Sequence, residues 1–421
     1  MTATAPRIRT WPFLLSGELR STGDTAEIRS PWSGEVVGLA ALAGPAEIAS
    51  ALDAAVAAAP LAAAMPSHAR AAVLDRIRAG IMERREEMAR LLAAEAGKPV
   101  GMARTEVDRA AFVFQQGAEE AKRMGGDVMP LDLQPHGEHR WGITRRFPLA
   151  PITGIIAFNY PVLLAAHKLA PAIACGATMV LKVPPQDPLA TLLLAEIIHG
   201  AGYPAGALSI LLCTNETAAP LIDDPRVRMI TFTGSARAGW AIKQRASTRR
   251  VTLELGGNAA VIIEPDADLD HAVTRCVAGG YVYAGQSCIS TQRILVHDSL
   301  HDEFTERYVA AVKKLRTGDP MADTTDVGPM IDQANADRAE AWIAEAVASG
   351  AKLVAGGTRN GAVLEPTVLL DTTSQMKVNC EEVFAPVTTV RAYDDFDDVL
   401  DTVNDSPYGL QAGLFTHDIR R

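Results

Sequence analysis

The sequence is poor in the residues that build metal centres, disulfide frameworks and membrane spans. It has only five cysteines in 421 residues, with no Cys-x-x-Cys pair and no cluster of histidines, so we expect no metal site. An odd number of scattered cysteines is typical of reduced thiols. No apolar run approaches the roughly 20 residues that cross a bilayer, and residues 1–9 lack the apolar core of a secretion signal. These absences favour a cytoplasmic protein without a membrane partner.

An excess of positive charge is also missing. The net charge of -10 and the isoelectric point near 5.5 argue against nucleic acid or an anionic membrane as a partner. No Gly-x-Gly-x-x-Gly follows an early strand, which excludes the ordinary Rossmann phosphate loop. What the chain does have is length and apolar residues: 421 residues at 48% hydrophobic are enough for two or three buried cores.

Periodicity divides the chain into a helical part and two α/β series. Residues 46–124 are rich in alanine and carry charges at helical spacing, which predicts three or four helices. Beyond them, short apolar runs alternate with helical segments, a pattern typical of parallel strands in an open, doubly wound sheet. The expected strands are 153–158, 178–181, 208–212, 228–232 and 251–255, followed in a second series from 259 by 292–296, 352–354 and 363–367, with a helix over 334–349. Residues 126–148 are predicted to form a hairpin.

Four segments have residues suited to chemistry. Cys288, in Tyr-Ala-Gly-Gln-Ser-Cys-Ile-Ser, and Glu254, in Leu-Glu-Leu-Gly-Gly, suggest a thiol nucleophile and a carboxylate base. Asn159 follows the apolar run 152–157, where its amide would donate to a developing oxyanion. The segment 232–239 follows a strand and opens a helical pattern, a layout that offers backbone amides to a phosphate.

Together these segments resemble the NAD(P)-dependent aldehyde dehydrogenase superfamily. The resemblance covers nearly the whole chain, because Lys182, the block 382–386 and the stretch 404–416 match further family blocks in order. Gly-Gln-Ser-Cys-Ile-Ser and Leu-Gly-Gly-Asn-Ala look most like the lactaldehyde dehydrogenase branch. The resemblance implies an α/β protein with a Rossmann-type cofactor domain over 1–125 and 149–257, a protruding oligomerisation hairpin over 126–148, and an α/β catalytic domain over 258–421.

The resemblance also implies a reaction. An aldehyde would be oxidised to a carboxylic acid with reduction of NAD(P), through a thiohemiacetal and a thioester on Cys288 that is then hydrolysed. Glu254 would activate the water, and its presence favours hydrolysis over acyl transfer to coenzyme A. Asn159 and the backbone N–H of Cys288 would bind the oxyanion. Lys168 lies where the family has a lysine near the site, and both a proton relay and a solvated helix lysine stay open.

The cofactor prediction is NADP or NAD. Pro185 stands where the family usually has a glutamate that binds the adenosine ribose hydroxyls and repels a 2'-phosphate, so NADP is tolerated, with Lys182 as its phosphate partner. The residues implied to bind the cofactor are Ile155, Ile156, Ala157, Phe158, Lys182, Pro185, Phe232, Thr233, Gly234, Ser235, Leu255, Gly256, Glu382 and Phe384.

The substrate residues are expected around a tunnel. By position these are Tyr160, His167, Ser287 and Ile289, with Arg109 and Phe114 nearby. Arg109 would bind an anionic tail, unless it forms a surface pair with Asp108. No ring of cationic side chains is visible in the sequence, which favours a small neutral or hydroxylated aldehyde such as lactaldehyde.

Family members continue beyond the position that matches Arg421, with segments that close the substrate funnel and pair with a neighbouring subunit. The sequence therefore predicts a catalytic domain that is truncated relative to the family, and a homodimer or homotetramer for the full-length form. It leaves one alternative open, a cofactor-binding protein of the same fold that has little activity because these segments are missing.

Overall fold

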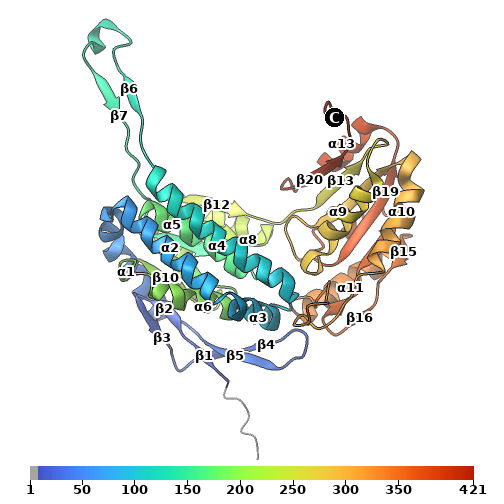
Figure 1. Cartoon of the computed structure of the whole chain (residues 1–421), viewed down its shortest axis with the longest axis horizontal. Helices are drawn as coiled ribbons and strands as arrows, with labels where there is room; N and C mark the ends of the chain where they lie inside the picture. Colours follow the sequence, from blue (N-terminus) through green and yellow to red (C-terminus); the bar gives the residue numbers. More distant parts are fainter. Residues whose placement is uncertain (1–7) are drawn as a thin grey trace, which may run out of the picture.

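The chain folds around two main sheets, which are separate in sequence and in space (Figure 1). The computed structural model describes residues 8–421. The prediction that residues 1–9 lack a secretion signal therefore falls mostly outside the described residues. One sheet has seven strands in the order β12-β11-β8-β9-β10-β2-β3, and the other has six in the order β15-β18-β19-β14-β13-β20. The division expected at residue 257 falls between β12 and β13, where the chain passes from the first sheet to the second.

The first sheet is parallel over five consecutive strands, from β12 at one edge to β10. Its strands are β2 (Phe13–Leu15), β3 (Glu18–Arg20), β8 (Ile152–Ile155), β9 (Met179–Lys182), β10 (Leu208–Leu211), β11 (Met229–Thr233) and β12 (Arg250–Glu254). All pairings among β8 to β12 are parallel, as the alternation of strands and helices predicts, whereas β2 joins β10 in antiparallel orientation. A separate small sheet contains β1 (Thr10–Trp11), β4 (Thr25–Arg29) and β5 (Val36–Ala41).

Four helices occupy the region that the sequence predicts to be helical. They are α1 (Pro45–Ala64), α2 (Ser67–Glu83), α3 (Arg85–Ala96) and α4 (Val100–Arg123), and they are followed between the strands by α5 (Pro161–Cys175), α6 (Leu189–His199), α7 (Ala219–Asp223) and α8 (Ala236–Arg245). Helix α3 ends at Gly97, whose φ of 69° is the left-handed conformation that stops a helix.

The expectation that no apolar segment is long enough to cross a membrane is wrong for α1. By length and composition this 20-residue helix meets that requirement, because alanine counts as apolar even where a helix is only partly buried. We call the seven-stranded sheet and the helices that cover it the first body. In the structure, Ile48 and Leu52 are buried in its core, so α1 is one of these helices.

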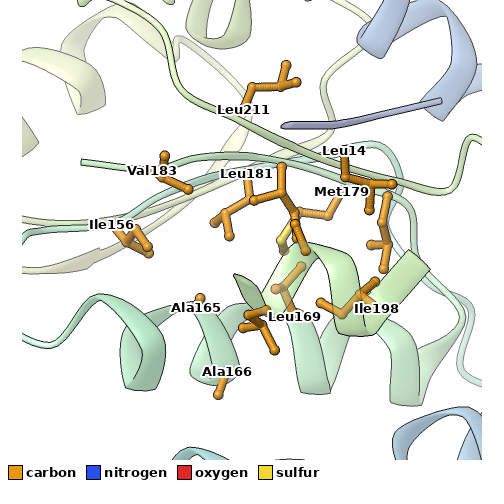
Figure 2. Packing of buried hydrophobic residues seen from close by; sticks show 14 of the residues in the cluster. Leu14, Ile156, Ala165, Ala166, Leu169, Met179, Leu181, Val183, Ile198 and Leu211 are labelled. Atoms are coloured by element: carbon orange, nitrogen blue, oxygen red, sulfur yellow. The ribbon is translucent and has the colours of Figure 1, made fainter. Parts of the chain in front are cut away.

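The core of the first body lies between the sheet and the helices that cover it. Figure 2 shows Leu169 of α5 and Ile198 of α6 packed beneath Met179 and Leu181 of β9. All four residues of β9 are buried, as expected for a parallel strand that is covered on both faces. Burial of large apolar side chains is the main stabilising contribution here, at about 25 cal/mol per Å² removed from water.

The second body, which is the six-stranded sheet with its helices, has its own core and differs from the expected strands at residues 363–367. Its elements are β13 (Ala259–Ile263), α9 (Leu269–Tyr281), η2 (Val282–Gly285), β14 (Thr291–His297), α10 (Asp298–Val312), α11 (Gln333–Ala348), β15 (Lys352–Ala355), β16 (Arg359–Asn360), β17 (Val363–Leu364), β18 (Thr367–Leu370), α12 (Lys377–Cys380), β19 (Val387–Tyr393), α13 (Phe396–Asn404) and β20 (Ala412–Phe415). The single strand expected over 363–367 is two strands: β17 pairs with β16, and β18 joins the main sheet. Pro366 separates them because proline cannot donate to a strand ladder.

A hairpin extends away from the first body (Figure 1). It contains β6 (Val128–Pro130), η1 (Pro135–Gly137) and β7 (Trp141–Ile143), and its paired strands are shorter than the sequence suggests. Leu133 and Phe147 are 82% and 73% exposed. Exposed apolar surface of this kind is typical of interaction sites, and the role of the hairpin in assembly stays a prediction.

Candidate active site

A pocket of about 460 Å³ collects most of the predicted site residues. The predicted residues that line it are Arg109, Ala157, Phe158, Asn159, Tyr160, His167, Thr233, Gly234, Ser235, Leu255, Gly256, Ser287, Cys288, Ile289, Glu382 and Phe384. Four further lining residues were not predicted from the sequence: Leu163 and Leu164 of α5, and Asn335 and Arg338 of α11. The first two follow Tyr160 by one helical turn, a signal that the sequence does contain, whereas α11 has no motif that connects it with the site.

Several predicted residues lie outside the pocket lining. Phe114 is wrongly placed at the substrate, because it is fully buried in the hydrophobic core of the first body. Ile156 and Phe232 are buried in the same core, and Ile155 packs against it. Lys182 ends β9 and is buried, while Pro185 lies three residues further on and is exposed. Glu254 and Lys168 also lie outside the lining, and their positions are described below.

Cys288 is held by a turn with unusual backbone geometry. We call residues 283–290 the nucleophile loop. It begins with Tyr283, Ala284 and Gly285 in the left-handed region, at φ 48°, 52° and 68°, and such angles persist only where the surroundings enforce them. The Gln286 side chain supplies part of that support, since its Oε1 accepts the Ile331 N–H at 2.9 Å. The thiol is therefore fixed at the pocket wall by backbone conformation.

The surroundings of Cys288 raise the pKa of its thiol. Burial is the main factor that raises its pKa, and the nearby carboxylate of Glu382 raises it further. Glu382 is held in place because its Oε1 accepts the Gly257 N–H at 3.0 Å. Since the thiolate is the nucleophilic form, a base or a bound cation has to act on this thiol before it reacts at neutral pH.

Asn159 places a buried amide side chain in the wall of the pocket. We call residues 156–160, which follow β8, the oxyanion loop. Asn159 is buried, and its Oδ1 has no hydrogen-bond partner among the described residues. Its backbone carbonyl is occupied, because it accepts a hydrogen bond from Lys98 Nζ at 2.7 Å. The side chain lines the pocket, and its Nδ2 amide group is the part that donates to an oxyanion.

Glu254 and Lys168 lie outside the pocket lining, and the charge of Glu254 acts on the pKa of Lys168. Glu254 is exposed at the end of β12, opposite Thr233 of β11. Lys168 Nζ donates to Thr231 Oγ1 at 2.9 Å. Burial lowers the pKa of Lys168 to about 8, while the negative charge of Glu254 opposes that shift. Lys168 is only 6% exposed, so the alternative of a solvated helix lysine is wrong.

The turn between β11 and α8 is suited to a dinucleotide. Ser235 caps α8, with its Oγ accepting the Ala238 N–H at 3.4 Å. A Cβ on Gly234 would lie 2.6 Å from the Phe232 ring, and one on Gly256 would clash with the Glu382 carboxylate. Glycine at both positions therefore allows close packing against Phe232 and Glu382. The N-terminus of α8 has the backbone N–H groups and the dipole that favour an anionic group such as a pyrophosphate. Within residues 8–421, no group of three or more His, Cys, Asp or Glu side chains is arranged to hold a metal ion.

Comparison with known proteins identifies the family. The model of the aldehyde dehydrogenase family matches residues 19–421. The chain belongs to the aldehyde dehydrogenase family. This aldehyde dehydrogenase is 43% identical to the 3-sulfolactaldehyde dehydrogenase of Priestia aryabhattai, over 81% of the chain and 72% of that protein. It is 35% identical to the NADP-dependent succinate-semialdehyde dehydrogenase of Escherichia coli, over 97% and 86%.

Solved structures agree with this assignment. The aldehyde dehydrogenase 21 of Physcomitrella patens, in complex with its reaction product succinate, superposes with a TM-score of 0.97 at 41% identity, covering 99% of this chain and 87% of that one. The lactaldehyde dehydrogenase of Escherichia coli superposes with a TM-score of 0.94 at 31% identity, covering 98% and 88%. The resemblance seen in the sequence and the predicted fold class are both confirmed.

The electrostatic surroundings of Cys288 lead to a prediction about pH. Glu382→Gln removes a negative charge that raises the thiol pKa, so alkylation of Cys288 by iodoacetamide should reach its half-maximal rate at a lower pH than in the wild type. Alkylation is followed by mass spectrometry of the Cys288 peptide. Glu381→Gln, an exposed neighbour that does not contribute to the shift, is the matched control. An unchanged midpoint in Glu382→Gln would mean that this carboxylate does not act on the thiol.

Proposed function

We propose that this aldehyde dehydrogenase oxidises an aldehyde to a carboxylic acid and reduces NADP or NAD, through a thiohemiacetal and a thioester on Cys288. The observation that supports this most directly is that Cys288 and Asn159 line the same pocket as the Gly234-Ser235 turn at the start of α8. A nucleophile, an oxyanion donor and a phosphate-binding turn are three of the parts that this chemistry requires.

The residues of the chain have distinct roles in the proposed reaction. After the Cys288 thiol has lost its proton to solvent, the sulfur bonds to the aldehyde carbon, and the carbonyl electrons move to the oxygen, where the Asn159 amide and the Cys288 N–H donate hydrogen bonds. A cofactor held at the Gly234-Ser235 turn would supply the nicotinamide that accepts the hydride from the same carbon, which would leave a thioester on Cys288. Glu254 then removes a proton from water, which attacks the thioester, releases the acid and restores the thiol.

Two substitutions separate the steps of this reaction. Cys288→Ala should abolish acyl-enzyme and reduced cofactor while cofactor binding is retained, because no other group replaces the thiolate. Glu254→Gln should release one equivalent of reduced cofactor in a burst and then accumulate thioester. Stopped-flow absorbance follows the burst, and mass spectrometry of the intact protein detects the thioester. Turnover by Cys288→Ala at near the wild-type rate would contradict the mechanism.

The substrate class in this proposal is an aldehyde with an anionic group at its other end. The earlier preference for a neutral aldehyde depended partly on assigning Arg109 to a surface pair with Asp108. In the structure Asp108 pairs with Arg85, while Arg109 lines the pocket. Two relatives, the 3-sulfolactaldehyde dehydrogenase and the succinate-semialdehyde dehydrogenase, are named for anionic aldehydes.

His167 shares the anionic end of the proposed site. It lines the pocket with Arg109, and burial lowers its pKa, with the charges of Arg109 and Lys168 adding to the effect. A lowered pKa leaves the imidazole neutral at pH 7, so His167 offers a hydrogen bond while Arg109 supplies the charge.

Arg109→Gln should therefore discriminate between substrates. With succinate semialdehyde, kcat/KM should fall about tenfold to a hundredfold, which corresponds to the loss of a hydrogen bond to a charged group. With butanal, a neutral aldehyde of the same chain length, kcat/KM should change little. Steady-state rates with both aldehydes test this, and Arg85→Gln, which removes a nearby surface cation, is the control. Equal losses on both substrates would remove Arg109 from the anionic subsite.

The choice of cofactor depends in this proposal on the end of β9. Pro185→Glu places a carboxylate near the position assigned to a 2'-phosphate, so NADP should bind more weakly while NAD binding is retained. Repulsion at this partly exposed range amounts to about 1 to 4 kcal/mol, or roughly tenfold or more in Kd. Fluorescence titration with both cofactors measures the ratio, and Gln186→Glu, one residue away, is the control. Equal affinities in Pro185→Glu would show that this residue does not face the ribose.

Assembly through the hairpin and a cytoplasmic location stay predictions.

A further inference from the structure

A buried lysine lies behind the pocket, and the reaction described above does not use it. Lys98 stands between Gly97, where α3 stops, and Pro99, which precedes α4. Its side chain is 0% exposed, it does not line the pocket, and its ammonium group forms an ion pair with Glu106 of α4. Burial of such a pair has a desolvation cost, which further contacts of the two charged groups have to offset.

The ammonium group of Lys98 contacts both loops that carry the reactive groups. It donates to the backbone carbonyl of Asn159 at 2.7 Å. It also lies 4.0 Å from the centroid of the Tyr160 ring and 4.4 Å from that of Tyr283, within the range of a cation–π contact. Tyr160 belongs to the oxyanion loop, and Tyr283 is the first residue of the nucleophile loop. One cation therefore connects the two loops from behind.

The two aromatic rings and the backbone complete this connection. The Tyr160 and Tyr283 rings meet edge to face, with 6.0 Å between their centroids. The Tyr283 hydroxyl donates to the carbonyl of Ala96 at 3.0 Å, two residues before Lys98. Both loops are thus held against the short segment that joins α3 to α4.

Glu106 fixes the helix that follows the oxyanion loop. Its Oε1 accepts the N–H groups of Val162 and Leu163 at 3.0 and 3.2 Å, which are free donors at the start of α5. Its other oxygen is the partner of Lys98. The position of Lys98 is therefore coupled to the point where α5 begins, directly after Asn159 and Tyr160.

A neighbouring carboxylate separates the role of Glu106 from that of Lys98. Glu95 is also buried, and its two oxygens accept the N–H groups of Leu189 and Ala190 at the start of α6, at 2.6 and 2.7 Å, with no lysine bonded to it. A carboxyl group without a lysine partner thus holds the first turn of α6, although burial raises the pKa of Glu95 to about 8. Lys98 adds to the corresponding arrangement at Glu106 its contacts with the two loops of the site.

We propose that Lys98, oriented by Glu106, is a positioning residue that sets the Asn159 amide relative to the Cys288 thiol. This rests on the proposed function, because the distance between the two groups matters only if both act on one carbonyl. Lys98 does not touch the reacting atoms, and it acts through the carbonyl of Asn159 and the rings of Tyr160 and Tyr283.

The first test compares substitutions that remove the contact in two ways. Lys98→Met keeps an unbranched side chain between the rings but loses the donor, and it leaves Glu106 without its partner. The double variant Lys98→Met/Glu106→Gln removes both charges of the ion pair, and Gln retains an acceptor for the start of α5. Asp108→Asn, which breaks a surface ion pair on the same helix, is the matched control.

In both variants kcat for aldehyde oxidation should fall about tenfold to a hundredfold, the range expected when a reacting group is displaced or an oxyanion donor is lost. KM and the Kd of NADP should change less than threefold, a split that general destabilisation does not predict. Restoration of kcat in the double variant would overturn the proposal, since it would trace the loss to an unpaired carboxylate.

A double-mutant cycle with Asn159→Ala tests whether Lys98 acts through Asn159. Residues that act through one another give losses that do not multiply. We expect the variant with both Lys98→Met and Asn159→Ala to be about as slow as Asn159→Ala alone. Losses that multiply would overturn the proposal.

A measurement without substrate separates this inference from the proposed function. Hydrogen exchange of residues 156–163 and 283–290 should be faster in Lys98→Met than in the wild type, while α10 in the second body exchanges at an unchanged rate. If the wild type oxidises no aldehyde, the proposed function fails, and this readout still decides whether Lys98 holds the loops. Unchanged exchange in both segments would overturn the inference.

Discussion

The parallel register of β8, β9, β11 and β12 is the constraint on which the site depends. Because these strands run in the same direction, the segments after their carboxyl ends lie along one edge of the sheet. Ile155 pairs with both Phe232 and Lys182, and Thr233 pairs with Glu254. The oxyanion loop, the turn before α8 and the proposed general base are therefore neighbours, although the chain between them contains several helices. A shift of one residue in this register would turn every side chain to the opposite face.

The second body supplies what the sheet edge lacks. It contributes Cys288 from the nucleophile loop and Glu382 from the segment before β19. The Glu382 carboxylate accepts the N–H of Gly257, the residue through which the chain enters the second body. One carboxylate thus accepts a hydrogen bond from the connecting segment while its charge raises the pKa of the Cys288 thiol. A change in the position of the connecting segment would therefore also change the pKa of the thiol.

The sequence predicts the parts of the site that follow strands in recognisable motifs. Asn159, Gly234 and Glu254 could be placed because each comes directly after an apolar run, and Cys288 because its neighbours match a family. Contacts set by tertiary packing could not be placed in this way. Asp108 and Arg109 are adjacent in sequence, yet neighbours on a helix do not face each other, and Asp108 pairs with Arg85 instead. The N-terminal strands, the burial of Lys168 and the approach of α11 to the pocket likewise depend on elements distant in sequence.

Residues 255–258 form the single covalent connection between the two sheets within residues 8–421. A side chain on Gly257 would clash with the carbonyl of Cys288, so this connection runs directly against the backbone of Cys288. Any rotation of one body relative to the other bends the chain between Glu254, at the end of β12, and the start of β13. Glu254 and Cys288 belong to opposite sides of this connection, and the separation between them therefore depends on the relative orientation of the two bodies.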